Sequence, residues 1–287
     1  MKKSIKTFLK HPTKDSSNRS ANPAVIRAST ILFDSMQELY NHEKKIKKHQ
    51  KVSHYSYGRY GSSTTIELEN MLKELEQAFH VFLTGTGFGG VALAIMSLCR
   101  PGDEILVSDN VYGPTKEISE KLLKEFNVIA KFYNPDSFDD LKDKVTKKTK
   151  MILVENPGSN TFEFQDLSKI VNLAKKKKIF TFLDNTWGTP LYLKPLKIGF
   201  DMSFSSATKY FSGHSDAMGG SLAVNKKVFK KVMFFYKLSG YRMSADEAYL
   251  IIRGLRTLDT RLSTHYENTK LVINFLKKQK KVKEILY

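Results

Sequence analysis

The sequence contains very few of the residues on which disulfide-bonded, zinc-bound and membrane-spanning proteins depend. Cysteine occurs once in 287 residues, at Cys99, which excludes an intrachain disulfide and a cysteine zinc cluster. No apolar run reaches the roughly 20 residues of a transmembrane helix. The basic N-terminus lacks the long apolar stretch of a signal peptide. We therefore expect a cytoplasmic protein without a membrane partner.

Arginine is also scarce, although the chain is strongly basic. Lysine and arginine total 47 against 29 acidic residues, a net charge of +18, and only eight of the 47 are arginine. Proteins that recognise phosphates and bases specifically favour arginine, because its planar guanidinium group can donate two hydrogen bonds at once. Scattered lysines instead favour non-specific attraction to polyanions. A specific nucleic-acid partner is disfavoured but stays open as an alternative, and the seven histidines show no metal-ligand spacing.

The regular part of the sequence alternates short apolar runs with helical patterns. This rhythm is typical of an α/β fold with a mostly parallel, seven-stranded sheet flanked by helices. Ligands of such folds bind at the carboxyl ends of the strands. The predicted strands are 81–84, 104–108, 128–133, 150–155, 179–185, 202–206 and 220–224, and the predicted helices include 64–79, 88–99, 114–126, 137–145, 166–177 and most of the chain after 244.

A glycine-rich stretch at residues 85–90, GTGFGG, predicts an anion site. It spells the dinucleotide fingerprint G-x-G-x-x-G between a predicted strand and a helix. A Rossmann unit normally stands first in its domain and closes its second strand with an acidic residue. Here Asp109 has the right distance, but a tight turn with an aromatic follows it, so we disfavour a dinucleotide. The amides of Gly87 and Phe88 at a helix N-terminus would suit a single phosphate.

Three further loops supply the other parts of a cofactor site. Tyr112 follows the second predicted strand, Asp184 ends the fifth, and Lys209 follows the sixth within SSATKYFSGHSD. A phosphate nest, a flat ring, a carboxylate for a ring nitrogen and a lysine for an aldehyde together fit pyridoxal 5'-phosphate (PLP). Each residue has a plainer interpretation, because Asp184 could cap a helix, Tyr112 could be a core aromatic and Lys209 could simply be exposed.

With these residues assembled, the chain resembles the cystathionine β-lyase branch of the Cys/Met-metabolism PLP-dependent enzymes, which have fold type I. The resemblance covers almost the whole chain from about residue 20. The motifs that carry it are VIRASTILF (25–33), YSYGRYGSSTTIELE (55–69), DEILVSDNVYGPTKE (103–117), VENPGSNTFEFQDL (154–167), LDNTWGTPL (183–191), SATKYFSGHSDAMGG (206–220) and ADEAYLIIRGLRTLDTRL (245–262).

The resemblance implies a role for each catalytic side chain. Lys209 would form the Schiff base with the cofactor, from a partly desolvated pocket, and later move the Cα proton. Asp184 would hold the ring nitrogen, and Tyr112 would stack on the ring and assist proton transfer.

It also implies how the cofactor phosphate is held. Ser206 and Thr208 would bind the phosphate beside the Gly87 and Phe88 amides. Tyr57 and Arg59 would reach the phosphate of a neighbouring subunit, so that a dimer-based homotetramer would share its active sites.

The implied reaction is β-elimination of L-cystathionine to homocysteine, pyruvate and ammonia, the step before methionine synthesis. Related γ-lyase or γ-synthase chemistry and a PLP-binding remnant with little activity remain alternatives. We expect an N-terminal arm at 1–60 that contacts the neighbouring subunit, a PLP-binding large domain at 61–255, and a long helix at 256–287. The family's small C-terminal domain, with the arginine that binds the substrate carboxylate, is expected to be missing, so we assign no carboxylate-binding residue and expect impaired turnover.

Overall fold

The centre of the molecule is a seven-stranded sheet in the order β1-β7-β6-β5-β4-β2-β3. The structure is a computed structural model and describes residues 4–10, 20–48, 50, 52–285 and 287. The pairs that β7 makes with β1 and β6 are antiparallel, and the other pairs are parallel. All seven predicted strands are confirmed to within one residue at each end: β1 His80–Thr84, β2 Glu104–Ser108, β3 Ile129–Tyr133, β4 Thr149–Glu155, β5 Phe180–Asp184, β6 Met202–Ser206 and β7 Gly220–Val224.

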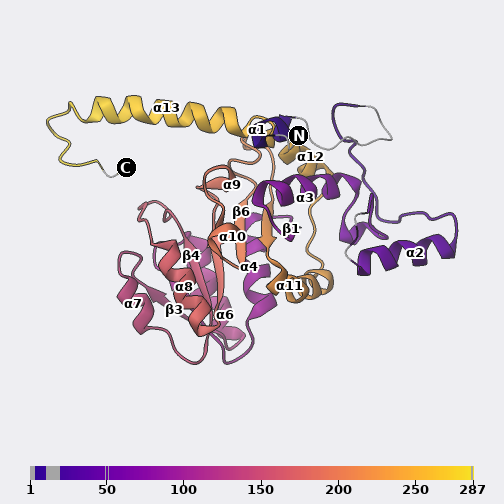
Figure 1. Cartoon of the computed structure of the whole chain (residues 1–287), viewed down its shortest axis with the longest axis horizontal. Coiled ribbons are helices and arrows are strands. Elements are labelled where there is room, and N and C mark those ends of the chain that lie inside the picture. The colour runs from indigo at the N-terminus through magenta and orange to yellow at the C-terminus, as the bar shows by residue number, and fades with distance from the viewer. Residues whose placement is uncertain (1–3, 11–19, 49, 51, 286) are drawn as a thin grey trace.

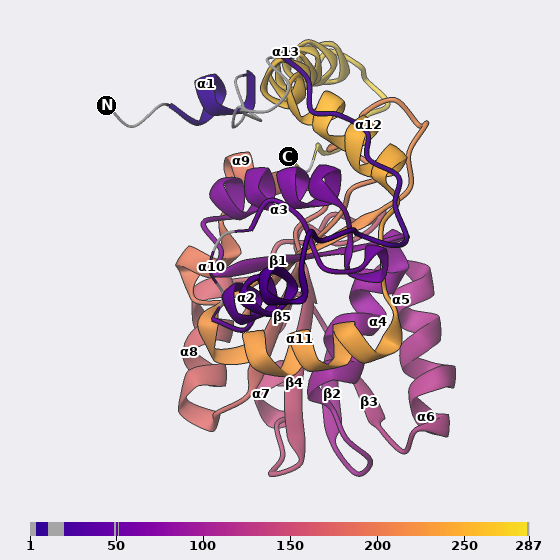
Figure 2. The same cartoon turned by 90° about the vertical axis from the view of Figure 1, so that its right-hand side faces the viewer.

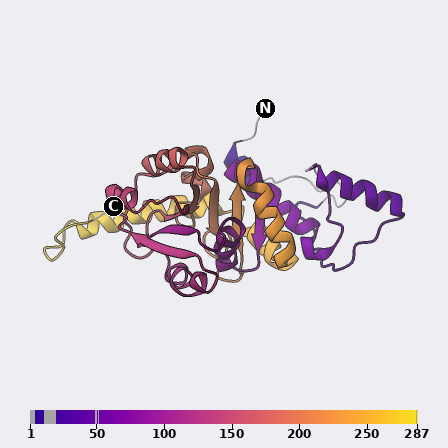
Figure 3. The ribbon, with the colours of Figure 1, turned by 90° about the horizontal axis from the view of Figure 1, so that it is seen from below.

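Helices cover both faces of the sheet, as the view from below makes plain (Figure 3). The core on one face joins the sheet to α4, α6 and α11. On the other face, α3 and α12 cover β1 and β7, while α7 and α8 cover β2, β4 and β5 (Figure 2). Central strands that are buried on both faces read as continuous apolar runs, which is why the sequence pattern located them.

Side-chain caps decide where most of these helices begin. Ser62 forms a capping box with Thr65 at the start of α3, and the side chain of Thr86 accepts a hydrogen bond from Gly89 N at the start of α4. The helices are α1 Ile5–Lys10, α2 Met36–Lys47, α3 Ser63–Glu76, α4 Gly87–Leu98, α5 Gly113–Glu117, a π-helical turn Ile118–Leu122, α6 Leu123–Glu125, α7 Phe138–Asp143, α8 Leu167–Lys177, α9 Thr189–Tyr192, α10 Pro195–Ile198, α11 Lys226–Ser239, α12 Ala245–Leu255 and α13 Leu258–Leu276.

The two ends of the chain behave differently from the central body. Helix α2 stands away from the body on one side, and α13 runs across the top toward the other (Figure 1). Helix α1 packs on the body, where Leu9 is buried and Lys6 pairs with Asp259 at 3.1 Å. Within the described part of residues 1–60, the predicted extended arm contains the α-helices α1 and α2, of which only α1 buries a side chain.

Two glutamates of α3 are buried in the interior. Tyr55 Oη donates to Glu69 Oε2 at 2.7 Å, and Glu76 lies fully buried near Lys194. Burial raises the pKa of each of these two carboxyl groups to about 8, because the charged form loses its hydration. In the part of the chain that the structure describes, no helix has both the length and the apolar character to span a membrane.

Candidate active site

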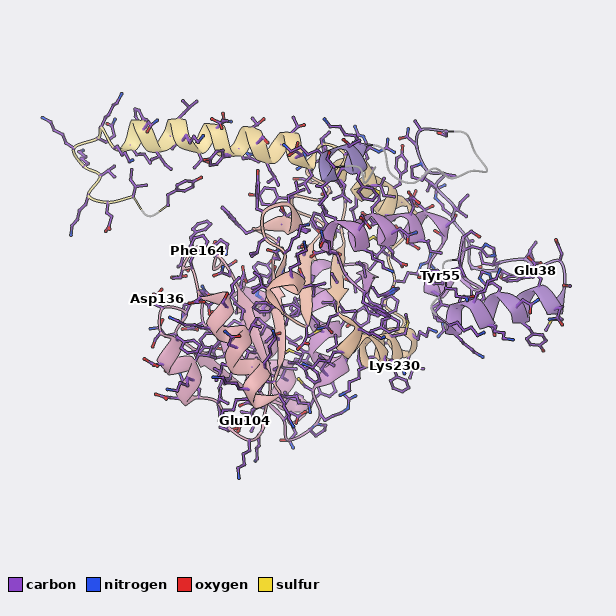
Figure 4. All side chains as sticks on the ribbon, in the orientation of Figure 1. Glu38, Tyr55, Glu104, Asp136, Phe164 and Lys230 are labelled. Atoms are coloured by element: carbon purple, nitrogen blue, oxygen red, sulfur yellow. The ribbon has the colours of Figure 1, made fainter. Side chains whose placement is uncertain are left out.

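The predicted site residues other than Tyr57 and Arg59 gather at the edge of the sheet that faces α13. Glu104, at the start of β2, lies at the bottom of Figure 4, whereas Phe164, in the loop after β4, lies well above it. The carboxyl ends of the parallel strands therefore point toward the top of the molecule. Because β1 also runs parallel to β6, the loop with Gly87 and the loop with Lys209 leave the sheet at the same edge.

The phosphate end of the site is built from three strands in register. Thr84 pairs with Gly220, and Gly220 pairs with Ser206. A Cβ added to Gly87 would stand 2.5 Å from Ser206 Oγ, so only glycine lets the start of α4 approach this close. The Thr86 cap engages Gly89 N, and the preceding amides of Gly87 and Phe88 lie at the positive end of α4. The chemistry of this corner fits an anionic phosphate.

Thr186 connects this corner to the carboxylate end of the site. Its hydroxyl accepts a hydrogen bond from Ser206 N at 2.8 Å, and its own N–H donates to Asp184 Oδ1 at 2.9 Å. The second bond spans two residues and is a typical Asx turn. Asp184 therefore orders the loop after β5 through an Asx turn rather than by capping a helix, and its role toward a cofactor stays a prediction.

A second carboxyl group lies beside Asp184. Glu155 ends β4 in register with Asp184, and its Oε2 accepts a hydrogen bond from Tyr112 N at 2.7 Å. Burial raises the pKa of both carboxyl groups, and the charge of Asp184 raises the pKa of Glu155 further. Tyr112 is not a core aromatic, because half of its side chain is exposed.

Lys209 lies three residues beyond β6, with its N–H donating to the carbonyl of Ser206 at 3.1 Å. Its side chain is exposed, so the described residues of one chain do not provide the desolvation that the resemblance implied. A pocket of about 730 Å³ opens beside it, lined also by Asp216, Glu247, Arg261 and His265.

Thr208 is turned toward the main chain of Gly219. Its hydroxyl accepts a hydrogen bond from Gly219 N at 3.1 Å. Gly219 precedes Gly220, and a Cβ on Gly220 would stand 3.2 Å from the Cα of Gly87. Thr208 is thus connected to the phosphate corner through the backbone of Gly219 and Gly220.

Tyr57 and Arg59 belong to a different part of the molecule. They lie in and beside a 3₁₀ turn at Gly58–Tyr60, where Tyr57 forms a bridge with Thr30. The Arg59 guanidinium lies 5.1 Å from the ring centroid of Tyr60 and 5.8 Å from that of Tyr57, and it donates to Tyr60 Oη at 3.3 Å. The structure of one chain does not bring these two residues to the Ser206 corner.

Two residues of the site were missed by sequence reasoning. Thr186 was passed over because a threonine in a polar loop is common, although its place two residues after Asp184 is a signal for an Asx turn. In the sequence, Glu155 is only the last residue of the predicted strand 150–155. The signal available was a charged residue at the end of an otherwise apolar strand. The next strand also ends in a carboxylate.

Comparison with known proteins identifies the class to which this site belongs. The sequence pattern described as "Cys/Met metabolism PLP-dependent enzyme" matches residues 6–287, and the chain belongs to that family. Family membership confirms the predicted dependence on PLP. The site described above fits this cofactor, because it joins a glycine-built anion corner, a strand-end carboxylate and a lysine.

Individual relatives share the family but differ in their named reactions. The chain is 34% identical over 273 residues to an L-alanine/L-glutamate racemase of Wolbachia pipientis, covering 93% of this chain and 67% of the relative. It is 33% identical over 286 residues to a cystathionine β-lyase of Bordetella avium, covering 98% and 71%. The chain thus spans about two thirds of the length of the curated relatives that it matches.

Solved structures confirm the predicted fold class. A cystathionine γ-synthase from Xanthomonas oryzae pv. oryzae superposes with a TM-score of 0.89 at 28% identity, covering 99% of this chain and 71% of that one. A cystathionine γ-lyase from Lactobacillus plantarum gives 0.89 at 25% identity, covering 98% and 71%. The chain has the α/β architecture of fold type I PLP-dependent enzymes.

Proposed function

We propose that this protein is a carbon–sulfur lyase that converts L-cystathionine to homocysteine, pyruvate and ammonia. The observation that carries the proposal is the continuous set of contacts from Asp184 through Thr186 to Ser206 and Gly87. Lys209 lies in the loop that directly follows Ser206. Cystathionine β-lyases stand among the relatives that are a third identical to the chain. The small-molecule substrate is therefore a sulfur amino acid.

The residues that would hold the cofactor occupy one edge of the sheet. Ser206, Gly87 and Phe88 would bind the phosphate, and Asp184 would keep a proton on the ring nitrogen. When bound, PLP supplies an acceptor for the electrons left at the substrate Cα. The aromatic ring of Tyr112 would cover one face of the cofactor and exclude water from it.

Lys209 would carry the proton transfers. Lys209 Nζ would hold the cofactor until the substrate binds, and it would then be available as a free amine. The free amine would then take the proton from Cα and give it to the sulfur as the Cβ–S bond breaks. One base can serve both steps because Cα and the sulfur are both bonded to the same atom, Cβ.

Tyr57 and Arg59 support a further part of the proposal, in which two subunits share each site. Neither residue contacts the phosphate corner of its own chain, and α2 stands away from the body beside them (Figure 1). Arginine is well suited to bind phosphate through two donors. We propose that they complete the site of a neighbouring subunit in a cytoplasmic, dimer-based homo-oligomer, with residues 61–255 as the PLP-binding domain.

The experiment that tests the function is an identification of products. The purified chain, loaded with PLP, is incubated separately with L-cystathionine, L-methionine and L-alanine. We expect pyruvate from cystathionine and none from a Lys209→Ala variant. Release of 2-oxobutyrate would favour a γ-lyase, and formation of D-alanine without a keto acid would favour a racemase. A chain that binds PLP but releases no product from any of the three would contradict the proposed lyase.

A further inference from the structure

Two carboxyl groups stand side by side where the cofactor requires only one. Glu155 and Asp184 are in register on adjacent parallel strands, so their side chains leave the sheet on the same face at neighbouring positions. Neither forms an ion pair with a lysine, arginine or histidine among the residues that the structure describes. Two like charges this close are costly unless a proton or a cation lies between them.

The groups that face Glu155 are known from its contacts. Its Oε2 accepts from Tyr112 N at 2.7 Å, and the hydroxyl of Ser159 also bonds to the carboxyl group. The Gln165 side chain donates to the Glu155 carbonyl at 3.3 Å. Asp184 is in turn bonded by Thr186 N. Among these neighbours Asp184 carries the only formal charge.

We propose that Glu155 is a positioning residue, which anchors the main chain of Tyr112 and supplies a second negative charge behind Asp184 once the cofactor's ring nitrogen carries its proton. The inference rests on the proposed function, because it requires PLP to bind with its ring nitrogen at Asp184. Glu155 acts through Asp184 and Tyr112 rather than by touching the reacting atoms.

The physical argument is a proton linkage. In the free chain, burial and then the charge of Asp184 raise the pKa of Glu155 to about 8, so the pair holds a proton near neutral pH. A cation at the ring nitrogen favours the ionised form of Glu155 and lowers its pKa. Because binding then releases a proton, the affinity for PLP rises with pH until Glu155 is already ionised in the free chain.

The test compares PLP binding by the wild-type chain and by Glu155→Gln between pH 6 and pH 8. Glutamine keeps an oxygen acceptor for Tyr112 N but cannot ionise. We expect the two Kd values to agree within about twofold at pH 6 and to differ by about tenfold at pH 8, with the variant weaker, since one proton contributes up to tenfold per pH unit. The ratio cancels the titration of the cofactor phosphate, which is common to both proteins.

Two further variants separate the position of Tyr112 from the charge. Glu155→Ala loses the acceptor as well, so we expect PLP to bind about tenfold more weakly still at both pH values. Glu155→Asp keeps an ionisable group and should keep the wild-type dependence on pH. Glu117→Gln, an exposed carboxylate on α5, is the matched control and should match the wild-type protein throughout.

The outcomes separate a failure of this inference from a failure of the proposed function on which it rests. If Glu155→Gln shows a constant Kd ratio from pH 6 to pH 8, the inference is wrong, while a wild-type chain that attaches PLP at Lys209 still has its proposed function. Loss of the pH dependence in Glu155→Asp would also contradict the inference. A wild-type chain that binds no PLP would overturn both.

Discussion

The carboxyl edge of the sheet and the segment around α2 differ in what determines their geometry. At the sheet edge, Asp184, Ser206 and Gly87 are held by strand register and by short hydrogen bonds within one chain. Around α2, large apolar side chains such as Leu32 and Tyr40 are exposed, at 88% and 60% of their surface. The hydrogen bonds of the first region all form within a single chain, whereas the second has the exposed apolar surface of an interface.

Lys209→Ala is expected to show the largest effect at the sheet edge. Removing the amine removes both the cofactor link and the proton carrier, so keto acid release should fall by at least about 1,000-fold. Activity and phosphopyridoxyl labelling after borohydride reduction are the measurements. Lys230→Ala, an exposed lysine on α11 (Figure 4), should behave as the wild type. Equal labelling of both variants would place the reactive lysine elsewhere.

Alanine substitutions in the two regions should differ sharply in stability. Phe182 of β5 is fully buried and stacks with Phe204 at 5.9 Å, so Phe182→Ala should lower the free energy of unfolding by about 3–5 kcal/mol. Tyr40→Ala on α2 should change it by no more than about 0.5 kcal/mol in the isolated chain. Urea denaturation measures both. A similar loss in Tyr40→Ala would mean that α2 already contributes to a packed interface in solution.

Arg59 allows the proposed sharing of sites to be tested directly. Arg59→Ala should weaken PLP binding by about 10- to 100-fold, since a hydrogen bond to a charged group is lost. Mixing Arg59→Ala with Lys209→Ala chains and allowing the subunits to exchange should restore about a quarter of the wild-type activity, because half the dimers then contain one intact site. Arg59→Lys provides a charge-retaining control. No recovery in a mixture shown to exchange would argue against shared sites.

The most gradual effect, spread over several pH units, concerns the buried carboxyl group of Glu76. Its pKa of about 8 in the folded chain lies above its unfolded value, so it stabilises the fold at low pH and this contribution is lost as pH rises toward 8. We expect Glu76→Gln to reduce the fall in stability by up to about 1 kcal/mol per pH unit between pH 5 and pH 8. Urea midpoints at three pH values measure it, with Glu117→Gln as control. An unchanged slope would contradict the assigned burial.

The sequence predicted the sheet better than the periphery for a physical reason. Strands buried on both faces, such as β4 and β5, must be apolar along their length, and few other segments of this chain are. Helix α11 was missed although its buried residues Val228, Phe229, Val232 and Tyr236 recur at helical spacing and Asn225 caps it. Helix α1 was missed because six residues are too few to show a period.

The site was predicted in its chemistry and incompletely in its contacts. The sequence singles out Lys209, Asp184 and Gly87 because they follow successive predicted strands and together offer the groups that PLP requires. Thr186 and Glu155 act through hydrogen bonds to the main chain and through register with a neighbouring strand. Such contacts depend on which strands become neighbours, and a single sequence does not specify that order.

The strand order also determines when each part of the sheet can form while the protein is being synthesised. Strand β1 pairs with β7, whose residues leave the ribosome about 140 positions later, and the Thr84–Gly220–Ser206 row exists only when both are present. Pairing between such distant segments is slow because a long loop must close first. The phosphate corner is therefore among the last parts of the sheet to form. The cofactor would bind there only after β7 has paired with β1.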